Sequence, residues 1–306
     1  MTLERWQLQQ LQGLPLEVKI AKTKLRLKEW YDHFNGQVYV SFSGGKDSTV
    51  LLHIARQLYP NIEAVFVDTG LEYPEIRKFV ATIDNVTYLK PIKPFNEIIK
   101  EYGYPIISKD VALRIEYARK GSSWAINSLK GLEKDGITKS IFKQRYMKYS
   151  YLLDAPFKTS SKCCLYLKEN PCHVFEKQSK KKPIIGTMAS ESKRREQGWL
   201  EVGCNAFDTK KPRSTPIAFW NEKDIWQYIR NYNIPYSKIY DMGYERTGCM
   251  FCMFGCHLDD VNKFQVLQKT HPKQYDYCIN KLGLGEVLDY IGVPYTTNQM
   301  TIDDFI

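Results

Sequence analysis

Two pairs of cysteines have the spacing of metal ligands. Cys163 and Cys164 are adjacent, and Cys249 and Cys252 form a Cys-x-x-Cys turn late in the chain. Each pair can place two thiolates on one metal, so the two pairs together complete four ligands. Zinc and an iron–sulfur cluster both accept four thiolates, and the residue types alone leave both open. Buried, inert thiols are the alternative.

A glycine turn between an apolar run and a helical pattern could bind phosphate. Backbone N–H groups at a helix start, with the positive end of the helix dipole, attract anions. Lys46 adds a positive charge, and an acidic Asp47 makes sense in this turn if Mg²⁺ accompanies the phosphates. The other residues expected to bind the phosphates are Ser43, Gly44, Gly45, Ser48 and Thr49.

This turn differs from the loop of kinase-like NTPases. That pattern has a glycine five positions before Gly45 and a Ser or Thr directly after Lys46. The chain has Val40 and Asp47 at those places. An ordinary strand-to-helix turn is the alternative to a phosphate site.

Polar residues that suit an anion site also follow two further predicted strands. An arginine fork can hold a pair of phosphate or sulfate oxygens, and the acids that follow the strand at 64–68 are expected to lie beside the phosphate turn. The residues concerned are Asp68, Glu72, Gly186, Arg194 and Arg195. Capping or solvated acids and a solvated basic face are the alternatives.

The elements that must position these residues alternate between strand and helix. Apolar runs predict strands at 38–42, 64–68, 86–89 and 183–188, and helical spacing predicts helices at 15–34, 74–83 and 95–102. Such alternation predicts an α/β fold with a doubly wound parallel sheet, whose ligands bind at the carboxyl ends of its strands. Asn221 is expected to cap a further helix that runs to Asn231.

Three regions are expected along the chain. They are an N-terminal helical segment (1–35), a nucleotide-binding α/β domain (36–245) and a helical, cysteine-bearing C-terminal segment (246–306). Residues 106–160 are a basic and aromatic insertion in the middle region. Interleaved cations and rings suit a surface that follows phosphates and stacks bases, and a solvated helical lobe is the alternative.

Composition narrows the classes of protein. The formal charge of the 306-residue chain is +10, which favours anionic partners. No apolar run approaches the roughly 18 residues of a membrane span, and no signal peptide is visible, so the expected location is cytoplasmic. In that compartment the eight cysteines are more typical of ligands or reactive thiols than of disulfides.

The Ser43–Ser48 string resembles the pyrophosphate-binding loop (PP-loop) of the adenine-nucleotide α-hydrolase superfamily. Three further segments resemble the phosphoadenylyl-sulfate (PAPS) reductase family of that superfamily. They are Val67–Glu75, the Cys163-Cys164 pair with the Leu165–Pro171 segment after it, and the late Cys-x-x-Cys. The resemblance runs from about residue 36 to 257.

This resemblance implies an adenine-nucleotide α-hydrolase-like α/β fold that binds a nucleotide and a metal cluster. The nucleotide would be ATP, or adenylyl sulfate or PAPS. In the iron–sulfur branch of the family, a Cys-Cys pair and a later Cys-x-x-Cys hold a [4Fe-4S] cluster. By that resemblance, the cluster ligands here are Cys163, Cys164, Cys249 and Cys252.

One departure from the family bears on the reaction. Sulfonucleotide reductases carry a nucleophilic cysteine in a Glu-Cys-Gly-Leu-His segment near the C-terminus, and this chain has no cysteine after Cys278. Cys278 lies in a helical, aromatic setting that is typical of a core residue. Cys256, followed by His257, is a faint echo of the missing segment.

Three functions are therefore weighed. The favoured hypothesis is ATP-dependent sulfur transfer to nucleic acid, with Lys46, Asp47 and Cys256 as catalytic residues, Asp47 on Mg²⁺, and a sulfur-donor protein as partner. The second is an adenylyl-sulfate or PAPS reductase that releases sulfite and uses thioredoxin. The third is a nucleic-acid-binding module with a structural cluster. A homo-oligomer is compatible with all three.

Overall fold

The computed structural model describes residues 3–297, which fall into two compact units. The first unit contains residues up to 68, 72–90 and 171–247, and the second contains 69–71, 91–170 and the residues from 248 onwards. The boundaries differ from those expected from the sequence, because the basic segment 106–160 and the C-terminal segment share one unit. Each unit is described by itself.

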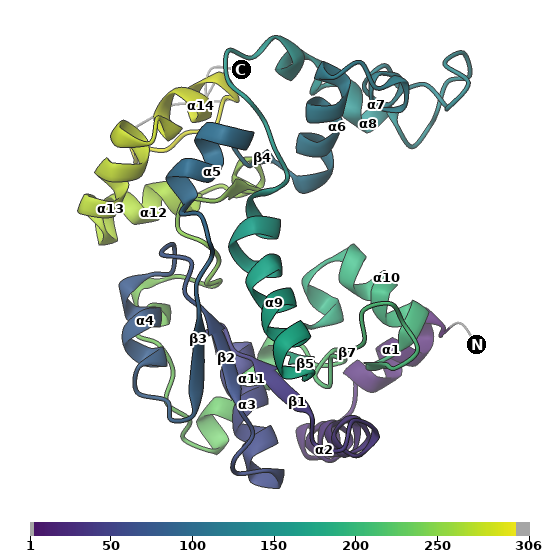
Figure 1. The fold of residues 1–306 in the computed structure, drawn as a ribbon, viewed down its shortest axis with the longest axis vertical. Coiled ribbons are helices and arrows are strands. Elements are labelled where there is room, and N and C mark those ends of the chain that lie inside the picture. Colours follow the sequence, from purple (N-terminus) through teal and green to yellow (C-terminus); the bar gives the residue numbers. More distant parts are fainter. Residues whose placement is uncertain (1–2, 298–306) are drawn as a thin grey trace. The chain divides into compact units, whose positions relative to one another are not determined.

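A six-stranded sheet forms the centre of the first unit (Figure 1). Its order is β3-β2-β1-β5-β7-β6, and every neighbouring pair is parallel except β6 with β7. The strands are β1 (Val38–Ser41), β2 (Ala64–Val67), β3 (Val86–Leu89), β5 (Lys182–Ile185), β6 (Asn205–Ala206) and β7 (Arg213–Ser214). The expected α/β fold with a mostly parallel sheet is confirmed.

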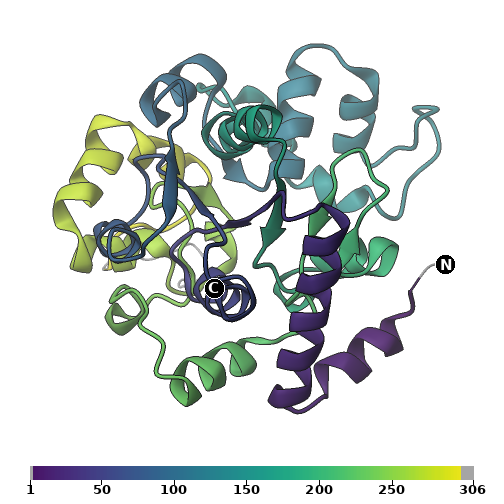
Figure 2. The same ribbon diagram turned by 60° about the horizontal axis from the view of Figure 1, so that its bottom comes forward.

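Helices cover both faces of this sheet. Helices α3 and α9 lie on opposite faces, as the two ribbon views agree (Figures 1 and 2). The helices are α1 (Arg5–Gln12), α2 (Leu16–His33), α3 (Lys46–Leu58), α4 (Pro74–Val80), α9 (Asn170–Ser179), α10 (Lys193–Val202) and α11 (Glu222–Asn231). Helix α4 ends at Val80 rather than at the expected residue 83, and β5 ends at Ile185 rather than at 188.

A buried ion pair fixes α2 against α11 within the first unit. The Lys19 side chain is 1% exposed, and its Nζ lies 2.6 Å from Asp224 Oδ2. The same Nζ donates a hydrogen bond to the carbonyl of Gln12. Asp224 also accepts from the backbone N–H of Asn221, the cap of α11. Because a buried charge without its partner is costly, this pair constrains how the two helices pack.

The second unit joins the basic segment to the C-terminal segment. Strand β4 (Ile106–Ile107) pairs in parallel with β8 (Met253–Phe254), directly after the Cys-x-x-Cys turn. The α-helices are α5 (Phe95–Tyr102), α6 (Lys109–Arg119), α7 (Ser123–Leu129), α8 (Gln144–Met147), α12 (Lys263–Thr270), α13 (Pro272–Asp276) and α14 (Leu284–Tyr290). No helix within residues 3–297 is long and apolar enough to cross a membrane.

Several short helical turns are not α-helical. Two are π-turns: Leu165–Glu169, which precedes α9, and Tyr277–Lys281, which follows α13. The 3₁₀ turns are Ser150–Asp154, Ala189–Glu191, Tyr240–Met242 and Cys256–Leu258.

The C-cap of α5 is a glycine, and replacing it tests the packing of the second unit. Gly103 has φ +110, and a Cβ there would lie 2.3 Å from the backbone carbonyl carbon of Lys158. We expect Gly103→Ala to lower the free energy of unfolding by roughly 3 kcal/mol or more, from backbone strain plus a clash with backbone. Denaturant unfolding of the purified protein measures it.

The matched control is Gly121→Ala. Gly121 also has a positive φ, of +81, but a Cβ there would meet nothing within 4 Å. It should lose only about 1 kcal/mol, from strain alone. Equal losses in the two variants would contradict the proposed clash.

Candidate nucleotide and cysteine sites

The PP-loop joins the end of β1 to the start of α3. Gly44 has φ +72, and a Cβ there would lie 2.7 Å from Val80 and 2.9 Å from Ile76. Both residues belong to α4, so only a glycine allows the turn to lie this close to that helix. Glycine is therefore required at position 44 for two reasons: its positive φ, and the lack of room for a Cβ beside α4.

Hydroxyl groups hold the loop in shape. The carbonyl of Gly45 accepts hydrogen bonds from the hydroxyls of Ser48 and Thr49, each at 2.9 Å. Ser48 Oγ accepts from the N–H of Ser43 at 3.2 Å, and Ser43 Oγ accepts from the N–H of Gly45 at 3.3 Å. The N-cap residue of α3 is Gly45, which has no side chain to cap the helix. These bonds hold the loop in shape, and the helix N-terminus carries the partial positive charge that attracts anions.

A second glycine brings the end of β5 against this loop. A Cβ on Gly186 would lie 3.1 Å from the Cα of Ser48 and 3.2 Å from its backbone nitrogen. Strands β1 and β5 are neighbours, and the order of the chain across the sheet reverses at β1. The expected residues Ser43–Thr49 and Gly186 therefore meet at the switch point of the sheet, where α/β folds bind ligands.

Asp47 carries a buried oxygen that lacks a hydrogen-bond partner. Among the described residues, no donor reaches its Oδ1. Burial raises the pKa of this carboxyl, while the charges of Lys46 and Arg195 lower it. A buried carboxylate oxygen beside an anion-binding turn is a hard donor of the kind that Mg²⁺ prefers, so the residue fits the predicted metal.

The sequence did not indicate what covers Lys46. Its Nζ donates to the carbonyl of Glu245 at 2.9 Å and lies 3.2 Å from a carboxylate oxygen of Glu222. Its backbone N–H donates to the hydroxyl of Tyr240 at 2.8 Å, and the ring of Tyr240 lies 5.2 Å from Nζ. A Cβ on Gly45 would approach Thr247 Oγ1 at 2.7 Å. Segment 240–247 and Glu222 therefore contact the groups that would bind phosphate.

The two arginines and Asp68, which were also predicted for this site, make different contacts. Arg195 forms an ion pair with Glu191 and is close enough to Asp47 to lower the pKa of that carboxyl. Arg194 is exposed on the same helix. Asp68 follows β2 and forms an ion pair with Arg77 of α4 at 2.9 Å. Of the two arginines, Arg195 is thus the one that can act on the loop.

The four predicted cysteine ligands come together in the second unit. Cys163, Cys164, Cys249 and Cys252 line one small pocket with Leu71, Phe95, Leu167, Lys168 and Phe254. Burial raises the pKa of Cys163, and the three other cysteines raise it further. Within residues 3–297, no group of three or more His, Cys, Asp or Glu side chains has the geometry to hold a metal ion.

Two other cysteines of the second unit are buried. Cys256 is 1% exposed, and its thiol donates to the carbonyl of Cys252 at 3.4 Å. Burial is the main reason that its pKa rises to about 12. A nucleophilic role would require this thiol to be uncovered. Cys278 is fully buried in the second π-turn, so the expectation that it is a core residue is confirmed.

A family model that describes the phosphoadenosine phosphosulfate reductase domain matches residues 37–104 and 125–254. The matched residues include the PP-loop, Gly186 and all four pocket cysteines. The chain belongs to the phosphoadenosine phosphosulfate reductase domain family.

Some relatives are longer than this chain. Two uncharacterized proteins of Methanocaldococcus jannaschii are 25% and 28% identical over 84% and 86% of this chain. The alignments cover only 43% and 53% of those two proteins. The chain thus spans about half the length of these relatives.

Other members of the phosphoadenosine phosphosulfate reductase domain family are named as enzymes. The adenosine 5′-phosphosulfate reductase of Anoxybacillus flavithermus is 24% identical over 82% of this chain and 87% of the reductase. Among solved structures, the PAPS reductase of Candida auris in a phosphate complex is 14% identical, with a TM-score of 0.44, over 81% of this chain and 97% of that chain.

The contact between Tyr240 and the loop predicts an effect on anion binding. A phosphate oxygen that accepts from the N–H of Lys46 must displace the Tyr240 hydroxyl. Tyr240→Phe removes this competitor, so we expect it to bind Mg²⁺–pyrophosphate about 3- to 10-fold more tightly, the worth of one hydrogen bond. Isothermal titration calorimetry with pyrophosphate measures the change.

Tyr236→Phe is the matched control. Its hydroxyl bonds Asp241 at 3.1 Å in the same part of the chain, so its removal should leave the affinity unchanged. Weaker binding by Tyr240→Phe would mean that the hydroxyl itself binds the anion.

Proposed function

We propose that this chain activates an acceptor with ATP and inserts sulfur into it, and that the acceptor is a nucleic acid. The observation that carries the nucleotide part is the PP-loop at the start of α3, with its buried lysine and the unpaired oxygen of Asp47. These groups suit the β- and γ-phosphates of ATP and a Mg²⁺ ion between them.

Each loop residue has a role in the first step. Lys46, Ser43 and Ser48 bind the β- and γ-phosphates, and Asp47 holds Mg²⁺, which neutralises phosphate charge. An oxygen of the acceptor attacks the α-phosphorus, its new P–O bond forms, and the bond to pyrophosphate breaks. Arg195 lies where it can offset the charge that develops. Catalysis comes mainly from positioning and charge neutralisation.

The second step replaces the activated oxygen with sulfur. A sulfide attacks the acceptor atom that bears the adenylylated oxygen, the new bond to sulfur forms, and AMP leaves with that oxygen. We propose that Cys163, Cys164, Cys249 and Cys252 hold a [4Fe-4S] cluster in the second unit. Such a cluster, when bound, supplies an iron that can carry sulfide. Cys256 is the thiol that could assist, provided that it becomes exposed.

The pocket chemistry suits a metal centre bound by thiolates. The four cysteines line one pocket. We infer a [4Fe-4S] cluster rather than zinc from the family resemblance of the two cysteine pairs, since thiolates alone suit both. Five side chains besides the cysteines line the pocket, and four of them are apolar, which suits a cluster shielded from water.

The acceptor is inferred from charge. Residues 106–160 contain eleven basic and five acidic residues, which accounts for six of the ten net positive charges of the chain. Aromatic rings are interleaved with these cations. Such a surface favours a polyanion with bases that can stack.

A second candidate function is reduction of adenylyl sulfate or PAPS to sulfite with thioredoxin. It is supported by the relative from Anoxybacillus flavithermus that is named as such a reductase. The two candidates share the nucleotide site and differ in the product.

The Lys46→Ala variant tests whether the PP-loop catalyses ATP cleavage. We expect anaerobically purified protein to release pyrophosphate and AMP from Mg²⁺–ATP in the presence of the acceptor, and Lys46→Ala to lower that rate about 100-fold or more, because a positioned charge is lost. Lys28→Ala, an exposed lysine on α2, is the control and should keep the wild-type rate.

The same preparations are incubated with adenylyl sulfate or PAPS plus thioredoxin. Sulfite release would contradict sulfur transfer and establish the second candidate. Pyrophosphate release by Lys46→Ala at the wild-type rate would exclude the PP-loop as the site.

Metal analysis tests the cysteine ligands. We expect the anaerobic protein to contain iron and acid-labile sulfide, and each serine variant of Cys163, Cys164, Cys249 and Cys252 to lose most of both, because a thiolate ligand is lost. Cys172→Ser, on α9 in the first unit, should retain them. Zinc without sulfide, or full iron in the four variants, would refute the assignment.

A further inference from the structure

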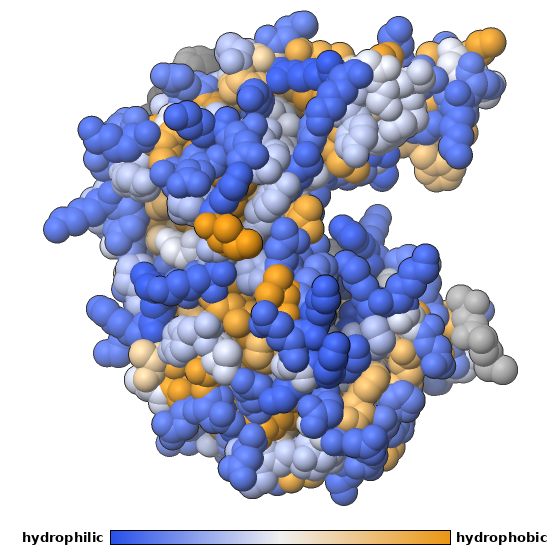
Figure 3. Space-filling view, viewed as in Figure 1, coloured by the Kyte–Doolittle hydropathy of each residue, from blue (hydrophilic) through white to orange (hydrophobic). Residues whose placement is uncertain are grey.

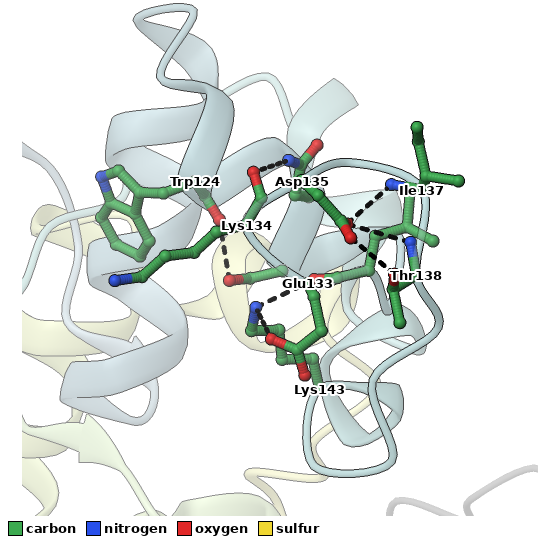
Figure 4. Close-up of polar contacts among 10 residues, drawn as sticks. Trp124, Glu133, Lys134, Asp135, Ile137, Thr138 and Lys143 are labelled. Carbon is green, nitrogen blue, oxygen red and sulfur yellow. Dashed lines mark hydrogen bonds and ion pairs between the residues drawn. The ribbon is translucent and has the colours of Figure 1, made fainter.

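A loop in the basic segment is held in a defined shape by its own hydrogen bonds (Figure 4). The N–H of Glu133 donates to the carbonyl of Thr138 at 2.7 Å, and Asp135 accepts from the N–H groups of Ile137 and Thr138. At its base, Lys143 Nζ donates to the carbonyl of Leu132. We call residues 131–143 the hairpin loop.

The carboxylate of Asp135 is the centre of this shape. Its hydrogen bonds to the hydroxyl and N–H of Thr138 and to the N–H of Ile137 lower its pKa to about 2. A carboxylate whose pKa is depressed stabilises its loop above its unfolded pKa and loses that effect only as the pH falls through about 2. At physiological pH the carboxylate is therefore ionised and able to accept these hydrogen bonds.

The hairpin loop presents apolar side chains to solvent. Ile137, Ile141 and Phe142 are 84%, 82% and 81% exposed. Hydrophobic side chains are visible at the outer end of this part of the second unit in the space-filling view (Figure 3). Three large apolar residues this exposed in a thirteen-residue loop are a surface that needs a partner.

Charge indicates which partner covers them. Lysines stand on both sides of the apolar residues, at 130, 134, 139, 143 and 148, with Arg145 among them. Glu133 and Asp135 are the acidic residues of this stretch, and both are bonded within the loop. The field around the apolar tips is thus positive, which favours a polyanion over an ordinary protein surface.

Aromatic rings that lie next to cations are also found beside the hairpin loop. The guanidinium of Arg114 on α6 lies 4.0 Å from the ring centre of Tyr146 and 5.6 Å from that of Trp124. Trp124 is 40% exposed and Tyr117 is 41% exposed. Exposed rings next to cations offer stacking faces to unpaired bases, which a membrane surface does not require.

We propose that the hairpin loop binds single-stranded nucleic acid, with Ile137, Ile141 and Phe142 against unpaired bases and the surrounding lysines on phosphates. The inference rests on the proposed function, because it names the surface that would hold the nucleic-acid acceptor. Apolar tips wedge against bases most readily where the bases are not already stacked in a duplex. The loop is therefore selective for single strands or unpaired loops.

Fluorescence anisotropy tests this binding without any nucleotide, so the result does not depend on PP-loop chemistry. The probes are labelled single-stranded DNA and RNA of mixed sequence and the matching duplex. We expect the triple variant Ile137→Ser, Ile141→Ser, Phe142→Ser to bind single strands roughly 10- to 100-fold more weakly, the range of one stacked base. The slope of the logarithm of the binding constant against the logarithm of the salt concentration should stay unchanged, because no lysine is removed.

Two control variants separate the parts of the surface. Ile92→Ser with Leu258→Ser removes apolar side chains that are 93% and 76% exposed outside the loop, and it should bind as the wild type does. Lys134→Ala with Lys139→Ala should reduce the salt slope by about one for each lysine. All changes are at exposed positions, and circular dichroism verifies the fold.

Three results would overturn the proposal. They are wild-type affinity of the triple serine variant for single strands, equal binding of duplex and single strand, and binding of anionic phospholipid vesicles that the triple variant loses while nucleic-acid binding persists. If the loop binds single strands and ATP is not cleaved, the proposed reaction fails while the surface stands.

Discussion

The pairing of β1 with β2 on one side and β5 on the other is the constraint on which the nucleotide site depends. Because all three strands are parallel, the turns that follow them leave the sheet at one edge. The PP-loop and Gly186 are brought together by that arrangement, and the missing side chain at Gly186 lets the β5 turn contact Ser48. A side chain at Gly186 would press against the backbone of Ser48 and so change the shape of the PP-loop.

The groups of the PP-loop that would bind an anion already have hydrogen-bond partners within the protein. Its amide and ammonium groups are engaged by Tyr240, Glu245 and Glu222. Anion binding is thus an exchange of partners, and the affinity is the difference between two sets of hydrogen bonds. A loop that always has partners avoids the cost of a buried, unpaired lysine. Such a site is selective for ligands with enough charge to replace several contacts at once.

Local patterns explain what could be predicted from the sequence. The PP-loop residues are contiguous, and the strands are short apolar runs between turn residues, so neighbouring residues carry the signal. The contacts of Lys46 could not be predicted, because Tyr240 and Glu245 lie far along the chain and carry no motif. Two further features depend on long-range packing, namely the shared unit of residues 106–160 and the C-terminal segment, and the burial of Cys256. The four pocket cysteines were predicted as one set because the two pairs resemble those of the family.

The order of the strands along the chain has a consequence for synthesis on the ribosome. β1, β2 and β3 emerge early, but β5 comes from residues 182–185, after the whole of residues 91–170 has been made. Until then β1 is an unprotected edge of an incomplete sheet, open to pairing with another nascent chain. The pairing of β1 with β5 joins residues far apart in the sequence, and such contacts form slowly. A domain built from one continuous segment would leave such a strand edge unpaired for a shorter stretch of synthesis.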